Sequence, residues 1–266
     1  MYEFNYQKAA SVADAAAKLG AGEDARLLAG GQTLVAAMKL RLAAPTDVID
    51  LGGIAELRGI ESDKNGITVG AMTTHAEVAS SPDVGKQISA LAELAESIGD
   101  PMVRNMGTIG GSIANNDPAA DYPAALLGLG AAVKTNQREI TADEFFTGMF
   151  MTALEPGEII VSVRFPKPKR AAYMKFSNPA SRYAIVGVFV AQTDHGVRVA
   201  VTGAGACVFR VPEMEKALSA KFSPDAVAGI SVASDELNSD LHASAGYRAH
   251  LITVMAKRAV EKAVAG

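Results

Sequence analysis

Two pairs of adjacent glycines, each followed by a predicted helix, constrain this chain of 266 residues more than any other feature. The first pair lies in residues 29–33 (AGGQT), directly after a buried strand predicted over residues 26–29, and the second lies in residues 108–112 (TIGGS). Glycine lets the backbone adopt positive φ and approach a ligand closely. The freed N–H groups at a helix start then favour an anion, typically a diphosphate. One Gly-Gly turn often only turns the chain, but two in one chain favour a clamp on a dinucleotide diphosphate.

Other glycine motifs that bind nucleotides or activate nucleophiles are missing. The sequence has no G-x-x-x-x-G-K-[ST] phosphate loop and no G-x-S-x-G nucleophile elbow. Residues 128–133 and 203–208 begin like a dinucleotide-binding fingerprint but lack its third glycine. These observations exclude kinase, P-loop NTPase and serine hydrolase interpretations.

The pattern of expected elements divides the chain into three segments. Residues 1–55 should form a small α/β unit, in the order helix (11–19), strand (26–29), helix (33–42) and strand (48–51). Residues 56–170 should form a larger α+β unit, with strands at 67–71, 131–135 and 158–165 and helices at 88–98 and 122–129. The proline-bearing stretch 166–170 is the predicted boundary between the second and third segments. Residues 171–266 should form an α+β domain, with strands at 184–191 and 197–202 and a last helix over 246–263.

The composition limits the kind of function. A net charge of −4 gives no indication of a nucleic-acid surface, and no apolar run is long enough to span a bilayer. The first residues lack the pattern of a secretory signal, so we expect a cytoplasmic protein. The single cysteine, Cys207, can form no internal disulfide and cannot ligate an iron–sulfur cluster, and the four histidines have no metal-ligand spacing. We therefore expect no metal site on this chain, and any redox chemistry must come from an organic cofactor.

The two glycine segments also carry a family resemblance. Residues 29–34 with 38–41 (MKLR), and residues 103–112 (VRNMGTIGGS) continuing into 117–121 (DPAAD), are similar to two signatures of the FAD-binding family of molybdopterin dehydrogenases. That family supplies the medium subunit of carbon monoxide dehydrogenases and xanthine-dehydrogenase-type enzymes. The resemblance covers nearly the whole chain. It implies a two-part FAD-binding domain of the vanillyl-alcohol-oxidase type, followed by a C-terminal α+β domain with an antiparallel sheet and helices.

The resemblance implies contacts with FAD for residues from several parts of the chain. Those matching the family's diphosphate and ribityl contacts are Ala29, Gly30, Gly31, Gln32, Thr33, Leu34, Thr108, Ile109, Gly110, Gly111 and Ser112.

Four further positions match looser family contacts, and each has a structural alternative. Asp121 would hydrogen-bond ribityl or ribose hydroxyls, or else cap the helix that follows it. Tyr183 would lie against the isoalloxazine ring, or else begin a buried strand. Ile160 and Lys175 would contact the cofactor, or else be a core residue and a solvated charge.

The function implied by the resemblance is electron transfer. The chain would be the FAD-binding subunit of a molybdenum hydroxylase, an oxidoreductase, with the molybdenum cofactor on a large partner subunit and [2Fe–2S] clusters on a small one. A dimer of heterotrimers would pass electrons through FAD to an external acceptor. No catalytic acid or base is required on this chain. Two alternatives stay open: an independent FAD-dependent oxidase or reductase acting on a small organic substrate, and a non-catalytic FAD-binding assembly or regulatory protein.

Replacing Gly31 with valine should abolish FAD retention. A side chain at this position would occupy the space that close backbone approach to the cofactor needs. The measurement is the flavin absorbance of the purified Gly31→Val protein relative to the native chain. Full flavin content in a folded variant would contradict the assignment of this loop to the diphosphate.

Overall fold

The N-terminal part of the chain is a small parallel α/β unit. The computed structural model describes residues 1–266. The unit contains β1 (Asn5–Lys8), α1 (Val12–Ala21), β2 (Ala25–Leu28), α2 (Leu34–Lys39) and β3 (Asp47–Asp50). Its three strands are parallel in the order β1-β3-β2. The expected helix–strand–helix–strand order is confirmed, and Ser11 caps α1 by accepting a hydrogen bond from the Asp14 N–H. The first strand, β1, was not predicted.

The middle part is built around a five-stranded antiparallel sheet in the order β4-β5-β10-β6-β7. Its strands are β4 (Ile60–Asp63), β5 (Gly66–Gly70), β6 (Ala132–Thr135), β7 (Glu139–Thr141) and β10 (Ile160–Pro166), and a separate hairpin consists of β8 (Phe146–Gly148) and β9 (Met151–Thr152). Its helices are the 3-10 helix η1 (Ala55–Leu57), α3 (His75–Ser80), α4 (Pro82–Gln87), α5 (Ser89–Glu96), α6 (Pro101–Arg104), α7 (Ile109–Asn115), α8 (Tyr122–Leu129) and α9 (Ala142–Phe145).

The C-terminal part has an antiparallel sheet covered by helices, as the family resemblance implied. The sheet runs β11-β12-β13-β14 in sequence order. Its elements are β11 (Arg170–Ser177), β12 (Ala184–Thr193), β13 (Gly196–Thr202), β14 (Phe209–Arg210), α10 (Pro212–Ala220), the 3-10 helix η2 (Pro224–Ala226) and α11 (Ala245–Ala265). The α+β fold class is thus confirmed.

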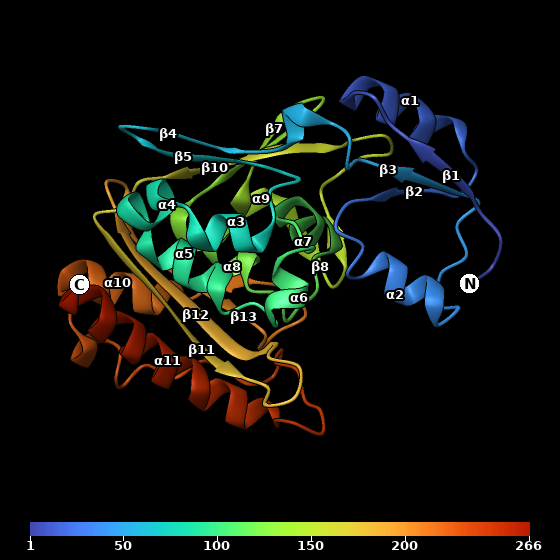
Figure 1. Cartoon of the computed structure of the whole chain (residues 1–266). Coiled ribbons are helices and arrows are strands. Elements are labelled where there is room, and N and C mark those ends of the chain that lie inside the picture. Colours follow the sequence, from blue (N-terminus) through green and yellow to red (C-terminus); the bar gives the residue numbers. More distant parts are fainter.

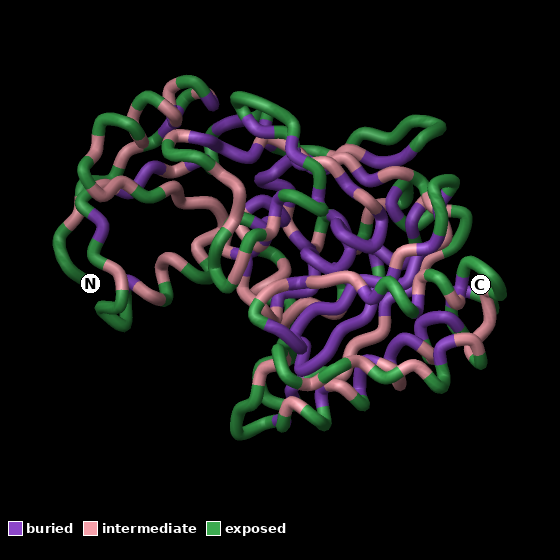
Figure 2. Tube along the Cα trace, turned by 180° about the vertical axis from the view of Figure 1, so that it is seen from behind, coloured by how far each residue is buried: buried purple, intermediate pink, exposed green.

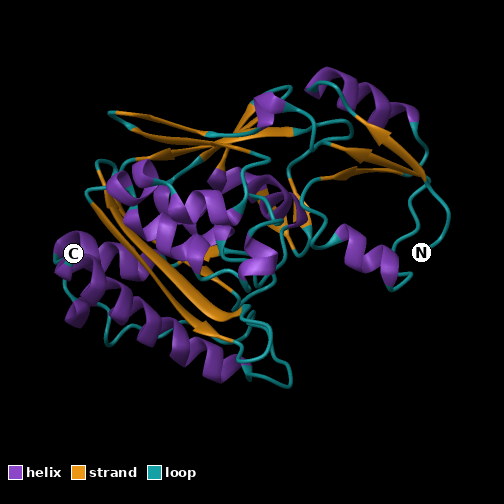
Figure 3. Ribbon diagram, in the orientation of Figure 1, coloured by secondary structure: helices purple, strands orange, loops and turns teal.

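The middle and C-terminal parts stack in layers, with helices between two sheets. Figure 1 shows α3, α5 and α8 between the sheet that contains β4, β5 and β10 and the sheet that contains β11 to β13, with α11 on the outer face of the second sheet. Figure 3 shows the same alternation of orange strands and purple helices. All eight residues of α8 are buried, because a helix that packs between two sheets has no solvent face.

Buried residues extend across the boundaries between the three parts. The largest core cluster has 32 buried residues and includes Tyr173 and Phe189 of the C-terminal sheet, together with residues of α5 and α8. The N-terminal unit has a core of only nine residues, to which Met72 and Ile159 of the middle part contribute. Figure 2 shows this contrast as a largely purple centre and a greener N-terminal end. The division into three domains at residues 55 and 170 stays a prediction.

Asn116 attaches the β8–β9 hairpin to the end of α7. It ends the helix in the left-handed conformation, with φ of 43°. Its buried side-chain amide donates to the carbonyls of Gly148 and Met151 at 2.8 and 2.7 Å. Its own carbonyl accepts from the Phe150 N–H at 3.2 Å. Three hydrogen bonds to one residue therefore hold the hairpin in place.

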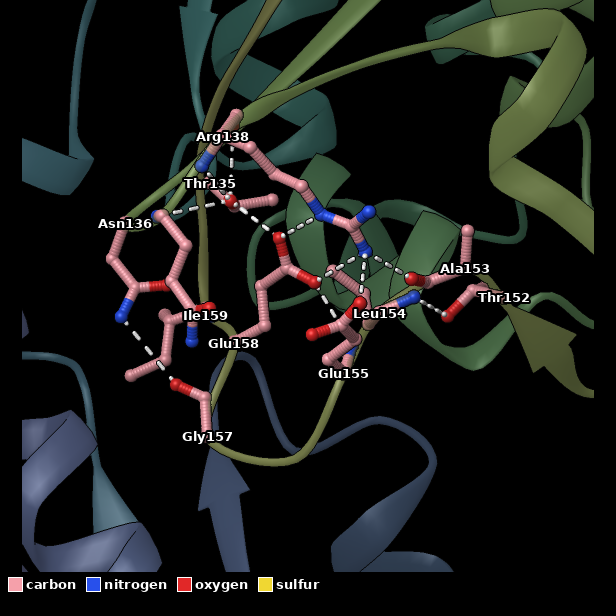
Figure 4. A network of polar contacts seen from close by, with 11 residues as sticks. Thr135, Asn136, Arg138, Thr152, Ala153, Leu154, Glu155, Gly157, Glu158 and Ile159 are labelled. Atoms are coloured by element: carbon pink, nitrogen blue, oxygen red, sulfur yellow. Dashed lines mark hydrogen bonds and ion pairs between the residues drawn. The ribbon is translucent and has the colours of Figure 1, made fainter.

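A polar network fixes the start of β10, which faces the candidate site. The Glu158 carboxylate accepts from Thr135 Oγ1 at 2.7 Å and from the Arg138 guanidinium at 3.0 and 3.1 Å (Figure 4). The Asn136 side chain accepts from the Ile159 N–H at 2.8 Å. These contacts tie the turn between β6 and β7 to the segment that enters β10. They thereby hold Ile159 and Ile160 in position.

None of the helices is both long and apolar enough to cross a bilayer.

Replacing Glu158 with glutamine should lower the free energy of unfolding at neutral pH by about 2 kcal/mol. This value allows for solvent screening of the ion pair, because the Arg138 side chain is 43% exposed. The hydrogen bond from Arg138 lowers the pKa of Glu158 from 4.5 to about 2. A depressed pKa in the folded state stabilises the fold above pH 4.5, and this contribution is lost as the pH falls toward about 2.

Urea denaturation of the native chain and the Glu158→Gln chain between pH 2 and pH 8 measures this difference. We expect it to be constant above about pH 5 and to shrink below that value. The matched control is Glu61→Gln, because Glu61 is exposed and makes no side-chain hydrogen bond. A difference that does not change with pH would contradict the role given to the Glu158 charge.

Candidate functional site

The main cavity of the protein lies where the three parts of the chain meet. It has a volume of about 640 Å³ and is lined by residues from both glycine loops, from the segment before β10 and from residues 181–183. This volume is in the usual range for sites that bind small molecules and cofactors. Of the fifteen residues predicted to contact FAD, only Ile109 and Lys175 do not line the cavity.

The first glycine loop presents a run of unpaired backbone donors to the cavity. The N–H groups of five consecutive residues have no hydrogen-bond acceptor within the chain: Gly30, Gly31, Gln32, Thr33 and Leu34. All five residues line the cavity. Successive free N–H groups in a turn form a concave site for an anion. The geometry of this loop therefore suits a phosphate or diphosphate group.

Both glycines of this loop are required by the backbone around them. A Cβ atom on Gly30 would lie 1.9 Å from the carbonyl oxygen of Met106, so the first loop rests directly on the segment that leads into the second loop. Gly31 has φ of +74°, which residues with a side chain rarely adopt. A Cβ at Gly31 would also lie 3.0 Å from Val35. Valine at position 31 would thus strain the backbone as well as fill space.

The second glycine loop differs from the expected cluster of free N–H groups. The Ile109 and Gly110 N–H groups donate to the carbonyls of Thr73 and Ala71 at 3.1 and 2.9 Å. The Gly111 N–H donates to Thr108 Oγ1 at 3.2 Å, and the Ser112 N–H donates to the Thr108 carbonyl at 3.0 Å. The loop is therefore occupied in attaching α7 to the segment after β5. The Ile109 side chain is fully buried in the core, and the residue does not line the cavity.

Asp121 lines the cavity but does not cap α8 with its side chain. Its carboxylate accepts from the Tyr173 hydroxyl at 2.5 Å and from Lys175 Nζ at 3.1 Å. Lys175 is not a solvated charge, since 5% of its side chain is exposed and Nζ also donates to the Ser97 carbonyl at 2.9 Å. The capping alternative for Asp121 and the surface alternative for Lys175 are both wrong.

Tyr183 is the one phenol ring in the cavity wall. It is 49% exposed and precedes β12, so it is not a residue of a buried strand. Partial burial of its ring, with the nearby charges of Asp117 and Asp121, raises the pKa of the Tyr183 hydroxyl. The adjacent Arg182 donates to the Gly99 carbonyl at 3.1 Å, and both residues line the cavity. The loop that carries Tyr183 is thereby attached to the segment before α6.

An apolar wall completes the cavity, and most of it was not predicted. Ile160 was predicted, and it lies at the start of β10 with 6% exposure, both in the core and in the cavity wall. Further apolar members include Ile98, Val103, Leu154 and Ile159. No motif distinguishes these four side chains from ordinary core residues. Their position in the cavity follows only from how the helices and strands pack.

His75 contributes a neutral imidazole to the cavity wall. Burial, assisted by the positive charge of Arg104, lowers the pKa of His75 to about 4. Its Nδ1 atom and the hydroxyl of the neighbouring Tyr122 are buried without a hydrogen-bond partner in the chain. The wall has acidic side chains at Asp117 and Asp121, basic ones only at Arg26 and Arg182, and no lysine. An anionic ligand would therefore depend mainly on backbone donors.

The features of the cavity fit the chemical parts of FAD. Unpaired N–H groups suit a diphosphate, a buried carboxylate suits hydroxyl groups, and an apolar wall with one aromatic ring suits a flavin. No group of three or more histidine, cysteine, aspartate or glutamate side chains is arranged to hold a metal ion.

Comparisons with known proteins agree with this interpretation. A family model described as the FAD binding domain in molybdopterin dehydrogenase matches residues 2–168. The chain is 37% identical to the carbon monoxide dehydrogenase medium chain of Hydrogenophaga pseudoflava, with 98% of this chain and 96% of the relative covered. It is 36% identical to the nicotine 6-hydroxylase medium subunit of Paenarthrobacter nicotinovorans, with 97% and 96% covered.

Solved structures show the same similarity over the whole chain. Carbon monoxide dehydrogenase from Oligotropha carboxidovorans superimposes with a TM-score of 0.92 at 34% identity, covering 99% of this chain and 98% of that one. Quinoline 2-oxidoreductase from Pseudomonas putida 86 gives 0.90 at 28% identity, covering 100% and 98%. The chain therefore belongs to the FAD-binding family of the molybdopterin dehydrogenases, as an FAD-binding oxidoreductase subunit of the molybdenum-hydroxylase type.

Proposed function

We propose that this chain is the electron-transfer subunit of a heterotrimeric molybdenum hydroxylase. It would accept electrons from [2Fe–2S] clusters on a small partner subunit and deliver them to an external acceptor. The molybdenum cofactor would lie on a large partner subunit, and two heterotrimers would pair in the cytoplasm. The observation that carries the proposal is the run of five unpaired N–H groups from Gly30 to Leu34 in a cavity with the other features that FAD requires.

The proposed contacts assign a different role to each part of the cavity. The backbone of residues 29–34 would hold the FAD diphosphate with its free N–H groups. Residues 108–112 would contribute the Thr108 and Ser112 hydroxyls and would support the first loop. Asp121 would accept a hydrogen bond from a hydroxyl group of the cofactor. Ile160 and Tyr183 would contact the flavin ring, which they would orient and partly shield from water.

The chemistry in this proposal belongs to the cofactor, and the chain supplies binding and orientation. Bound FAD supplies the capacity to accept two electrons and to release them singly or in pairs. The single cysteine, Cys207, cannot hold a cluster that takes four protein ligands. The [2Fe–2S] donors would therefore belong to a partner chain. Because the pKa of His75 is lowered to about 4, this side chain would add no charge to the cavity at neutral pH.

The relatives support a role that does not depend on one substrate. Proteins named for carbon monoxide, nicotine and quinoline contain a chain similar to this one over nearly its full length. A shared subunit among enzymes with such different substrates is expected if substrate recognition lies on another subunit. We propose the same arrangement here.

Gentle affinity purification of this chain from its native cell, followed by an absorption spectrum, tests the proposed function. We expect flavin bands, iron–sulfur absorption and two co-purifying chains, one larger and one smaller. Flavin bands from a lone polypeptide would favour an independent flavoenzyme. Absence of flavin from the native chain would overturn the assignment of the cavity to FAD.

Replacing Gly30 with alanine should weaken FAD binding about tenfold or more and lower the melting temperature. The new Cβ would overlap the Met106 carbonyl oxygen, so the two loops would have to separate. The dissociation constant can be measured by fluorescence titration of the apoprotein with FAD. The matched control is Gly20→Ala, because Gly20 lies within α1 and has no atom near its Cβ position. Equal affinity in the Gly30→Ala and Gly20→Ala chains would contradict the role of this contact.

A further inference from the structure

A buried polar cluster lies directly behind one wall of the cavity. It consists of Asp121, at the start of α8, and of Tyr173 and Lys175, both on β11. The Tyr173 hydroxyl donates to Asp121 Oδ1 at 2.5 Å, and Lys175 Nζ lies 3.1 Å from both carboxylate oxygens. The side chains of Asp121 and Lys175 are each 5% exposed. Only Asp121 lines the cavity. The two donors therefore reach the cavity only through this carboxylate.

The backbone around the cluster leaves room for these contacts. Gly187 lies on β12 opposite Lys175 in the strand register. A Cβ atom at Gly187 would lie 2.2 Å from the Tyr173 hydroxyl oxygen. The lack of a side chain there gives this hydroxyl its place beside Asp121. Lys175 is held independently, because Nζ also donates to the Ser97 carbonyl.

We propose that Tyr173 and Lys175 are positioning residues that keep the Asp121 carboxylate ionised and oriented as the acceptor for a hydroxyl group of the FAD ribityl chain. This inference rests on the proposed function, because it assumes that the cavity holds FAD. An ionised carboxylate has about four acceptor positions. Tyr173 and Lys175 use some of them and leave capacity on the side of the cavity. Lys175 thus acts on the cofactor through Asp121 and not by direct contact.

The charges around Asp121 explain why the carboxylate needs both donors. Burial raises the pKa of the Asp121 carboxyl, and the Lys175 charge and the Tyr173 hydrogen bond oppose this effect. The other titratable groups whose charge interacts with it are Tyr122 on α8 and Tyr183 in the cavity wall, and Tyr183 also interacts with Asp117. Lys175 is the one cation among these groups. Without either donor, less would offset the destabilisation of the ionised carboxylate by burial. The protonated acid would then be favoured.

Titration of the full chain with FAD over the whole pH range in which the chain stays folded tests the proposal, with flavin fluorescence as the readout. Because the ionised carboxylate is the acceptor, affinity should fall as the pH falls through the pKa of Asp121. In Tyr173→Phe the FAD dissociation constant should rise about tenfold near neutral pH, and the fall in affinity should begin about one pH unit higher. A merely structural role of Tyr173 would weaken binding without moving this pH dependence.

Two further variants keep the test decisive. Tyr122→Phe makes the same chemical change at a buried hydroxyl that has no hydrogen-bond partner, and it should bind FAD like the native chain at every pH. The double variant Lys175→Met with Asp121→Asn removes both buried charges together, so it avoids leaving one of them unpaired. It should fold and bind FAD more weakly, with an affinity that no longer depends on pH in this range.

The possible outcomes separate this inference from the proposed function. A native chain that binds FAD together with a Tyr173→Phe chain of unchanged affinity and pH dependence would overturn the inference alone. A pH-dependent affinity in the double variant would also overturn it, because the titrating group would then lie elsewhere. A native chain that does not bind FAD at any pH would overturn the proposed function itself.

Discussion

The close approach of the Gly30 backbone to the Met106 carbonyl is the constraint on which the cavity depends. It brings the turn after β2 against the segment that leads into the second glycine loop, with a separation that excludes even one methyl group. The N-terminal unit has its own parallel sheet and joins the middle part at this point and through the small core that includes Met72 and Ile159. The cavity is therefore a consequence of how two units meet, and neither unit contains it alone.

The two glycine loops look alike in sequence but have different physical roles. The first leaves five successive N–H groups without acceptors, which is tolerable only where water or a ligand can pair with them. The second has four N–H groups that donate to neighbouring protein oxygens. The first loop is thus suited to bind a ligand, and the second attaches α7 to the segment after β5. A Gly-Gly motif indicates that the backbone can adopt unusual conformations. It does not predict which acceptors the N–H groups of the loop will have.

Much of the fold could be predicted because local signals agreed with one another. Ser11 as a cap, with Asp14 three positions later, predicted α1, although the helix continues past Gly20 to Ala21. The Ala/Leu-rich run from Tyr122 to Leu129 predicted α8 with the correct bounds. Short edge strands such as β1 and β4 were not predicted, because their residues are mostly exposed and lack a clear alternation of apolar and polar side chains. The apolar cavity wall and the contact of Tyr173 with Asp121 depend on the packing of distant segments, so no local pattern could predict them.

The small core of the N-terminal unit has a thermodynamic consequence for the whole chain. Nine buried residues remove little apolar surface from water compared with the 32 of the largest cluster. A ligand that contacts the loops of both units binds only when the N-terminal unit is packed against the middle part. Its binding free energy therefore stabilises this packed state. The cofactor would then help to hold the N-terminal unit in place. Local opening of this unit and loss of flavin would occur together. In such a protein the content of flavin after purification measures conformational integrity as much as it measures affinity.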